Sequence, residues 1–318
     1  MKNRVVTHKV FAAVAVAAGI SLAVPVFAQS TGQGQAIVTV LPKHNGEMAP
    51  NITQQDLSVK VNGKAAKITS WEALRGEQGP VELVILIDGS ARNSLGRQMQ
   101  EIEQFVRTLP PNVKSTIAYM QEGSAVLAGP LSSDRGQELK GLHLPGGLPG
   151  SDASPYFCLS DLAKRWPSQD RSARREVVMI TDGVDNYERR LDPDDPYVQA
   201  AMTDSVRAGL VVYAIYWRDM GRINSTGYAD NTGQSLLNEV AEATGGRNFW
   251  NGIGNPVTFT PFFDELKRRL NNQYELGFTT TSNGKPEVAS MRFKLSAPNV
   301  EVDAPNQVVV IPSGTAQK

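Results

Sequence analysis

Two predicted strands in this sequence each end in an aspartate. Val81–Ile87 runs into Asp88-Gly-Ser90, and Arg175–Thr181 runs into Asp182. Apolar runs of this kind are typical of parallel strands that are buried on both faces. Because open α/β sheets bind ligands beyond the carboxyl ends of their strands, we expect the two carboxylates and the Ser90 hydroxyl at one edge. Such oxygen ligands suit Mg²⁺ or Mn²⁺, so the pattern indicates a site for one of these ions.

These segments resemble the von Willebrand factor type A (VWFA) domain. The metal-ion-dependent adhesion site of that family uses Asp-x-Ser-x-Ser, a distant Thr and a distant Asp. The resemblance implies that Asp88, Ser90 and Asp182 are metal ligands, and that an acidic side chain of a protein partner completes the metal site. More narrowly, the chain is similar to bacterial secreted VWFA-related proteins of the acidobacterial type, through Leu57–Lys64, Ala243–Arg247 and Gln273–Phe278.

Two positions depart from the family pattern. The stretch that stands for the family's Gly-Gly-Thr contains Ser154, which the resemblance implies is the remaining ligand, with Ser151 or Asp152 as alternatives. Arg92 replaces the second Ser of the motif. Its guanidinium could pair with Asp88 and stand where the cation would be, or point outward and leave a weakened site. Two functions are therefore predicted. One is a protein-binding module that recognises an acidic partner at the Asp88 edge, with or without metal, and the other is a metal-free structural or assembly component of the cell envelope whose contacts lie on a β domain built from the two chain ends.

The first residues of the chain predict export. Met1–Ala28 has a basic start, a core rich in Ala and Val, and Val26-Phe27-Ala28 before Gln29. This is the pattern of a cleaved signal peptide, with an uncleaved membrane anchor as the alternative. No later segment is apolar and long enough to span a bilayer. We therefore expect a periplasmic, cell-surface or extracellular protein without an integral membrane segment after cleavage.

Composition excludes several classes of function. The 32 Lys and Arg residues balance the 32 Asp and Glu residues, so nothing favours nucleic acid or an anionic membrane as the partner. Cys158 is the only cysteine, which rules out an internal disulfide and suggests a buried apolar residue. Ser90 lacks the Gly-x-Ser-x-Gly context of a nucleophile, and no motif places His44 or His143 as a base. We predict that the protein is not an enzyme.

The order of the elements predicts the architecture. Residues 79–272 alternate strands with helices, which predicts an α/β fold with a doubly wound, mostly parallel sheet, as in the VWFA family. Residues 29–78 and 273–312 alternate like β-strands, and each flank alone is small for an independent core. We therefore expect both flanks to pair into one small β domain, followed by a disordered tail at 313–318.

Overall fold

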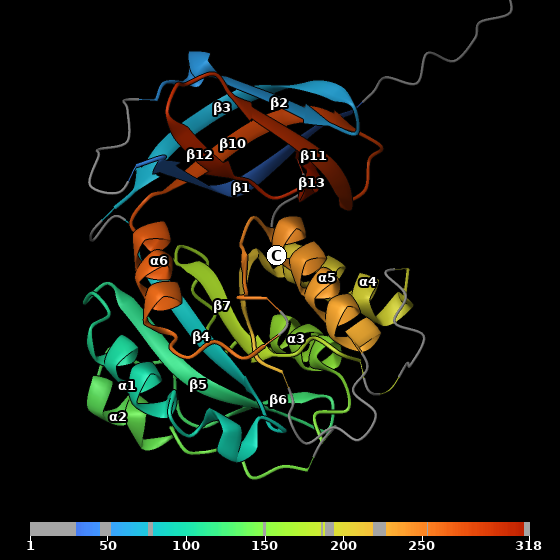
Figure 1. The fold of residues 1–318 in the computed structure, drawn as a ribbon. Coiled ribbons are helices and arrows are strands. Elements are labelled where there is room, and N and C mark those ends of the chain that lie inside the picture. The colour runs from blue at the N-terminus through green and yellow to red at the C-terminus, as the bar shows by residue number, and fades with distance from the viewer. Residues whose placement is uncertain are drawn as a thin grey trace, which may run out of the picture.

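The computed structural model describes residues 30–44, 52–75, 79–148, 151–185, 187, 194–218, 227–252 and 254–314, without the side chains of Arg92 and Asn93. The predicted signal peptide, and the tail from Thr315 on, lie outside the described residues. Two parts make up the fold, a β-barrel and a sheet with helices on both faces (Figure 1). Within the described ranges, no helix is long and apolar enough to cross a membrane.

The barrel is built from both ends of the chain. Its strands follow the order β10-β3-β2-β11-β13-β1, and β1 pairs again with β10, which closes a ring of six antiparallel strands. A further strand, β12, pairs with the end of β1. The strands are β1 (Ser30–Pro42), β2 (Leu57–Val61), β3 (Lys64–Leu74), β10 (Gln273–Ser282), β11 (Glu287–Leu295), β12 (Val300–Asp303) and β13 (Gln307–Pro312).

Local sequence explains the barrel's hairpins and its core. Asn62 and Gly63 both have positive φ, as a two-residue turn between antiparallel strands requires, and they join β2 to β3. In β2, Val59 and Val61 point inward while Ser58 and Lys60 are exposed. The same alternation along the other strands collects one apolar core inside the ring, which includes Val38, Val40, Leu276, Phe278, Met291 and Val310.

The second part is a six-stranded mixed sheet in the order β6-β5-β4-β7-β8-β9. Four neighbouring pairs are parallel, and only β6 runs antiparallel to its neighbour. Every residue of the central strands β4 and β7 is buried. The strands are β4 (Val81–Asp88), β5 (Val113–Gln121), β6 (Ser124–Leu127), β7 (Arg174–Thr181), β8 (Leu210–Tyr216) and β9 (Asn248–Phe249).

Helices cover both faces of this sheet. Helices α1 (Met99–Arg107), α2 (Arg135–Lys140) and α6 (Thr260–Leu270) share one apolar core with one face. Helices α3 (Pro155–Lys164), α4 (Pro196–Ala208) and α5 (Gly227–Thr244) share the other core. Short 3-10 helices occur at Gln54–Asp56 and Arg92–Leu95. In α1 the apolar residues Ile102, Phe105 and Val106 are buried.

The predicted fold class is wrong for the chain as a whole. We expected a doubly wound, mostly parallel α/β fold with a small β accessory, and the structure has a closed antiparallel barrel beside a mixed sheet. The barrel contributes more strands than the sheet, and it has a core of its own. The physical reason is ring closure. Each flank alone has exposed strand edges, whereas the pairing of β1 with β10 removes those edges and encloses the apolar faces.

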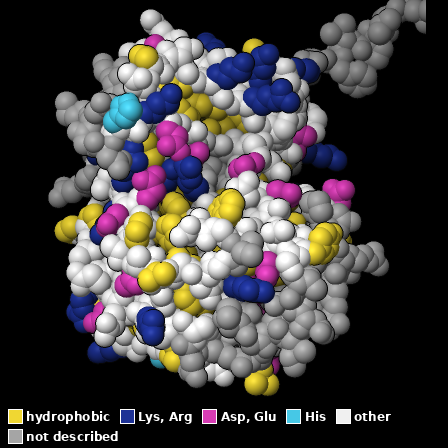
Figure 2. Space-filling view, viewed as in Figure 1, with side chains coloured by type: hydrophobic (Ala, Val, Ile, Leu, Met, Phe, Trp, Pro, Cys, Tyr) yellow, Lys and Arg dark blue, Asp and Glu magenta, His cyan; other side chains and the backbone are white. Residues whose placement is uncertain are grey.

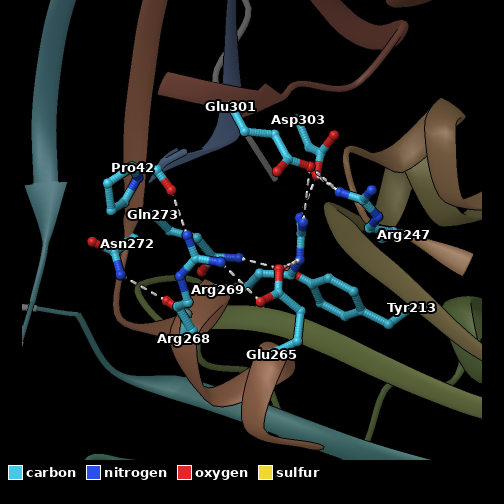
Figure 3. A network of polar contacts seen from close by, with 10 residues as sticks. All are labelled: Pro42, Tyr213, Arg247, Glu265, Arg268, Arg269, Asn272, Gln273, Glu301 and Asp303. Carbon is cyan, nitrogen blue, oxygen red and sulfur yellow. Dashed lines mark hydrogen bonds and ion pairs between the residues drawn. The ribbon is translucent and has the colours of Figure 1, made fainter. Parts of the chain in front are cut away.

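Polar contacts join the two parts at the amino ends of the parallel strands. Arg269 of α6 is fully buried, and its Nε lies 3.0 Å from Glu265 Oε1. Its guanidinium also contacts Asp303 of β12, and Arg247 contacts Glu301 of the same strand, as Figure 3 shows. The barrel therefore lies against one end of the sheet, and the carboxyl ends of β4 and β7 lie at the opposite end (Figure 1).

Candidate functional site

Asp88 is the last residue of β4 and is held by three hydrogen bonds. Its Oδ1 accepts from the Ser90 backbone N–H at 2.8 Å and from the Ser90 hydroxyl at 2.6 Å. Its Oδ2 accepts from Thr181 Oγ1 of β7 at 2.8 Å. Asp88 and Ser90 are both buried, at 3% and 1% exposure. A side chain at Gly89 would meet the Met120 carbonyl at 2.5 Å, so the turn after β4 requires glycine.

Asp182 follows β7, the neighbouring strand, and is also buried. Its Oδ1 accepts from the Val184 backbone N–H at 2.9 Å. Helix α5 packs directly on this turn. The contact is so close that a Cβ at Gly233 would lie 2.2 Å from the Asp182 carbonyl oxygen. The structure therefore places Asp88 and Asp182 at the carboxyl ends of adjacent strands.

Ser154, which the family resemblance implies is a metal ligand, lies at the start of α3. It caps α3, where its Oγ accepts from the Tyr156 backbone N–H at 3.2 Å. The same hydroxyl donates to Asp185 Oδ2 at 2.9 Å. Asp185 in turn accepts from the Tyr187 backbone N–H at 2.7 Å. The contacts of Ser154 thus tie α3 to the loop after β7.

Of the two alternatives to Ser154, Ser151 lies beside the Asp88 turn. Its Oγ is 3.5 Å from the position of a Cβ on Gly89. That oxygen is buried and has no hydrogen-bond partner among the described residues. The backbone carbonyls of Ser151 and Asp152 accept from Glu122 and Gly123, which fixes this loop against the end of β5. The Ser151 hydroxyl thus lies close enough to the Asp88 turn to be considered as the fourth member of the predicted ligand set.

The buried acids make this end of the sheet electronegative. Burial raises the pKa of Tyr156 well above its ordinary value, and the charges of Asp185 and Asp182 raise it further. Burial also raises the pKa of Cys158, with added contributions from Asp152 and Asp88. Both affected side chains, Tyr156 and Cys158, belong to the first turn of α3. Within the described ranges, no three His, Cys, Asp or Glu side chains form a metal-binding group.

Arg92 follows the turn that holds Asp88 and Ser90. The backbone of Arg92 begins the 3-10 helix directly after the Asp88 turn, and the Ala91 N–H donates to the Asp88 carbonyl at 3.1 Å. The Arg92 side chain lies outside the described residues.

Aromatic side chains lie beside the acidic turn. Tyr187 is 64% exposed, and its ring makes an edge contact with Tyr197 at 5.6 Å between centroids. Phe157 of α3 packs on both rings. Trp217, in contrast, is buried in the core that the sheet shares with α1 and α6, and its Nε1 donates to Ser94 Oγ at 3.1 Å.

Sequence reasoning missed two residues of this site. Thr181 holds Asp88 across the two strands, and Asp185 holds Ser154. A signal existed for both, because they flank Asp182 in the run Thr-Asp-Gly-Val-Asp. Thr181 directly precedes Asp182 at the end of β7, where its hydroxyl can reach the end of the neighbouring strand β4. Asp185 lies three positions after Asp182, where its carboxylate can reach the N-terminus of α3.

Comparisons with known proteins are limited to structural similarity. No family model and no curated protein matches this sequence. An aerotolerance-related membrane protein from Bacteroides fragilis is 18% identical, with 60% of this chain and 99% of that chain covered and a TM-score of 0.41. The SpRpn10 VWA domain is 13% identical, with 56% and 98% covered and a TM-score of 0.37.

A third similar structure is the pilus adhesin SpaC of Lactobacillus rhamnosus GG, at 9% identity and a TM-score of 0.43. The match covers 86% of this chain and 49% of the adhesin, so this chain spans about half its length. Similarity at these values supports no statement about what this chain binds. The similar structures thus include a VWA domain, whereas membership of the secreted bacterial family stays a prediction.

Proposed function

We propose that this chain is an exported, non-enzymatic binding module that recognises another protein at the carboxyl ends of β4 and β7. The observation that carries the proposal is the convergence of Asp88, Ser90 and Asp182 on one buried edge. Burying several carboxylates together is costly unless positive charge or hydrogen bonds compensate them. An arrangement of this cost at a strand edge where ligands commonly bind favours a binding role.

The oxygen atoms at this edge fit a Mg²⁺ or Mn²⁺ ion. Asp88, Ser90 and Asp182 would hold it, and Ser151, whose buried hydroxyl lacks a partner among the described residues, would be the fourth ligand. Ser154 fits less well, because its oxygen serves the α3 cap and Asp185. When bound, the ion would supply a positive charge that a carboxylate of the partner protein can coordinate.

The chain's own residues would prepare this site. Thr181 and the Ser90 backbone hold the Asp88 carboxylate in one orientation, and the Val184 N–H does the same for Asp182. Because these donors fix the acids before any ligand arrives, little side-chain entropy would be lost on binding. The Ser90 hydroxyl donates to a carboxylate and not to a histidine, in keeping with a binding role without catalysis.

A second candidate is a metal-free structural component of the envelope. The observation in its favour is that each of the three acids Asp88, Asp182 and Asp185 already accepts hydrogen bonds from neighbouring backbone or hydroxyl groups. In that case Arg92 would supply the positive charge at this edge. The two candidates differ in one measurable property, which is the effect of divalent ions on stability.

Thermal melts with EDTA or with excess Mn²⁺ distinguish the two. A metal site gives an Mn²⁺-dependent stabilisation of about 2.7 kcal/mol at an ion concentration of about 100 Kd. Asp182→Asn should abolish that shift, whereas Asp264→Asn, an exposed aspartate on α6, should retain it. Arg92→Ser should enlarge the shift if Arg92 points outward. If no variant responds to Mn²⁺, the metal site is refuted and the structural component remains.

Partner recovery tests the binding role itself. The tagged chain, incubated with an envelope extract, should retain a protein in Mg²⁺ and release it in EDTA. The Asp182→Asn variant should fail to retain that protein in either buffer. Retention that is equal for both chains in both buffers would mean that the contact lies elsewhere on the molecule.

A further inference from the structure

The barrel has an open seam between β11 and β12. Strand β11 pairs with β13 over Glu287–Ser290, and the Met291 N–H still donates to the Asn306 carbonyl at 2.7 Å. Beyond that point β12 pairs with β1 and not with β11. Pro305 lies in the segment between β12 and β13, directly before Asn306, and it has no N–H with which to extend the pairing to β11. Within the described residues, no strand is paired with this edge of Arg292–Leu295.

The seam is a groove with an apolar lining. It has a volume of about 570 Å³ and lies between the second half of β11 and the valines of β12. Its apolar side chains are only partly buried, although they pack against the barrel core. They are Phe293, Leu295, Val300, Val302 and Ala304. We call this surface the β11–β12 groove. It leaves apolar area in contact with water beside unpaired strand edges, a combination that natural sheets generally cover.

Basic side chains border the groove. Arg292 and Lys294 alternate with the apolar residues of β11, and both are exposed. Arg292 stands directly opposite Lys60 of β2, and like charges in that position destabilise a sheet. None of these three takes part in an ion pair within the described ranges. Figure 2 shows Lys and Arg side chains gathered over the barrel, with apolar side chains between them.

The acids on the other wall do not neutralise this charge. Glu301 and Asp303 belong to β12, but they do not line the groove. They are engaged by Arg247 and Arg269 at the junction of barrel and sheet (Figure 3). The alternation of β12 therefore turns its valines toward the groove and its carboxylates toward the other part of the molecule. The charged side chains that line the groove, Arg292 and Lys294, are both basic.

We propose that the β11–β12 groove binds an extended, acidic segment of a partner protein by strand addition. The segment's backbone would pair with the unpaired edge of β11, as extended peptides do at open sheet edges. Every second side chain would point into the apolar lining, and the side chains between them would face Arg292 and Lys294. The segment should therefore alternate apolar and acidic residues. This surface is separate from the Asp88 edge, so either proposal can fail without the other.

Fluorescence anisotropy with a labelled synthetic peptide tests this. The probe is an extended peptide of alternating valine and glutamate, titrated with the full chain. We expect binding that weakens as salt is added, because the charges are exposed. A peptide with lysine in place of glutamate should bind at least about tenfold more weakly, since it places like charges opposite Arg292 and Lys294. Equal binding of the two peptides would overturn the proposal.

Matched variants locate the contact. The double variant Arg292→Glu, Lys294→Glu should bind the glutamate peptide at least about tenfold more weakly than the unmodified chain does, and should bind the lysine peptide more tightly. Both positions are exposed, so its melting temperature should stay near that of the unmodified chain. The control, Lys140→Glu with Lys285→Glu, makes the same change of net charge at exposed positions outside the groove and should leave binding unchanged. If both double variants lose the same affinity for the glutamate peptide, the effect comes from net charge alone and the proposed site is refuted.

The backbone contribution has its own test. A glutamate peptide with N-methyl groups on alternate residues has no backbone N–H along one of its two edges. It cannot donate hydrogen bonds to β11 from that edge, so it should bind weakly or not at all. Unchanged affinity would refute strand addition. Sedimentation of the full chain identifies the occupant: a monomer that binds the peptide supports a partner segment. A dimer that Arg292→Glu dissociates would mean that a second copy fills the groove, and would overturn the assignment to a partner.

Discussion

Glu176 offers a sharp test of how the sheet meets the barrel. It lies near the start of β7 and is fully buried, with neither carboxylate oxygen in a hydrogen bond of normal geometry. Burial raises its pKa from the ordinary 4.5 to about 7, although the nearby Arg174 guanidinium acts in the opposite direction. Arg174 itself is occupied by the carbonyls of Gly79 and Leu270 and by Gln273.

The sign of the effect on stability follows from this pKa. The folded chain binds a proton at Glu176 more tightly than the unfolded chain does, so folding is favoured when the residue is protonated. This contribution is complete below about pH 4.5 and is lost as the pH rises through about 7. A pKa difference from 4.5 to about 7 corresponds to about 3 kcal/mol, as an order of magnitude.

Replacement of Glu176 by glutamine should therefore stabilise the protein in alkaline buffer. We expect Glu176→Gln to raise the free energy of unfolding by up to about 3 kcal/mol near pH 8, and to leave it nearly unchanged near pH 4.5. Urea denaturation of both chains at the two pH values measures this. The control Glu103→Gln removes an exposed carboxylate that pairs with Arg107, and should change stability by less than about 1 kcal/mol at either pH.

Two results would refute this reasoning. Equal stabilisation at both pH values would mean that shape and not ionisation is responsible. Destabilisation near pH 8 would mean that ionised Glu176 is held by Arg174 as a favourable buried ion pair, since removing one partner of such a pair costs several kcal/mol.

Further predictions concern the junction, the acidic edge and the cysteine. Arg269→Ala should cost about 3 kcal/mol in urea denaturation, because it removes a fully buried guanidinium that pairs with Glu265 and Asp303, while Arg269→Met, which keeps most of the side-chain volume, should cost less. Equal losses would assign the effect to the lost charge and not to packing. Gly233→Ala should lower the melting temperature because its Cβ would overlap the Asp182 carbonyl, whereas Gly227→Ala, in open space, should not. Cys158 should react with a thiol reagent only on unfolding, because it is fully buried and burial raises its pKa; rapid labelling of the native chain would contradict this.

The sequence predicted the strands of the sheet better than the architecture of the chain. The apolar run before Asp88 forms β4, and the run before Asp182 forms β7, both buried throughout. These predictions succeed because burial on both faces leaves a continuous local signal. The fold class was wrong because ring closure leaves no such signal. The pairing of Ser30 with Ser282 joins residues at opposite ends of the chain, and no local pattern encodes it.

The candidate site shows the same limit at the level of side chains. Asp88 and Asp182 could be placed at one edge because both follow central strands. Ser154 was assigned from motif alignment, although Ser154-Pro155 has the pattern of a helix N-cap followed by proline at the first turn, which is what the structure contains. The position of Ser151 beside Gly89 depends on the path of a long loop, which residue types alone do not determine.

The long-range pairing of β1 also bears on how the chain reaches its fold. Residues 30–39 pair with residues 273–282, and the whole sheet with its helices lies between them in sequence. During synthesis β1 is made early, but its partner appears only after more than two hundred intervening residues. The strands of the mixed sheet pair with strands that lie closer in the sequence, so this sheet can form first. Until β10 is made, the apolar side of β1 has no partner from that strand. The slow step of folding should therefore be closure of the ring, and an incomplete chain should aggregate through β1.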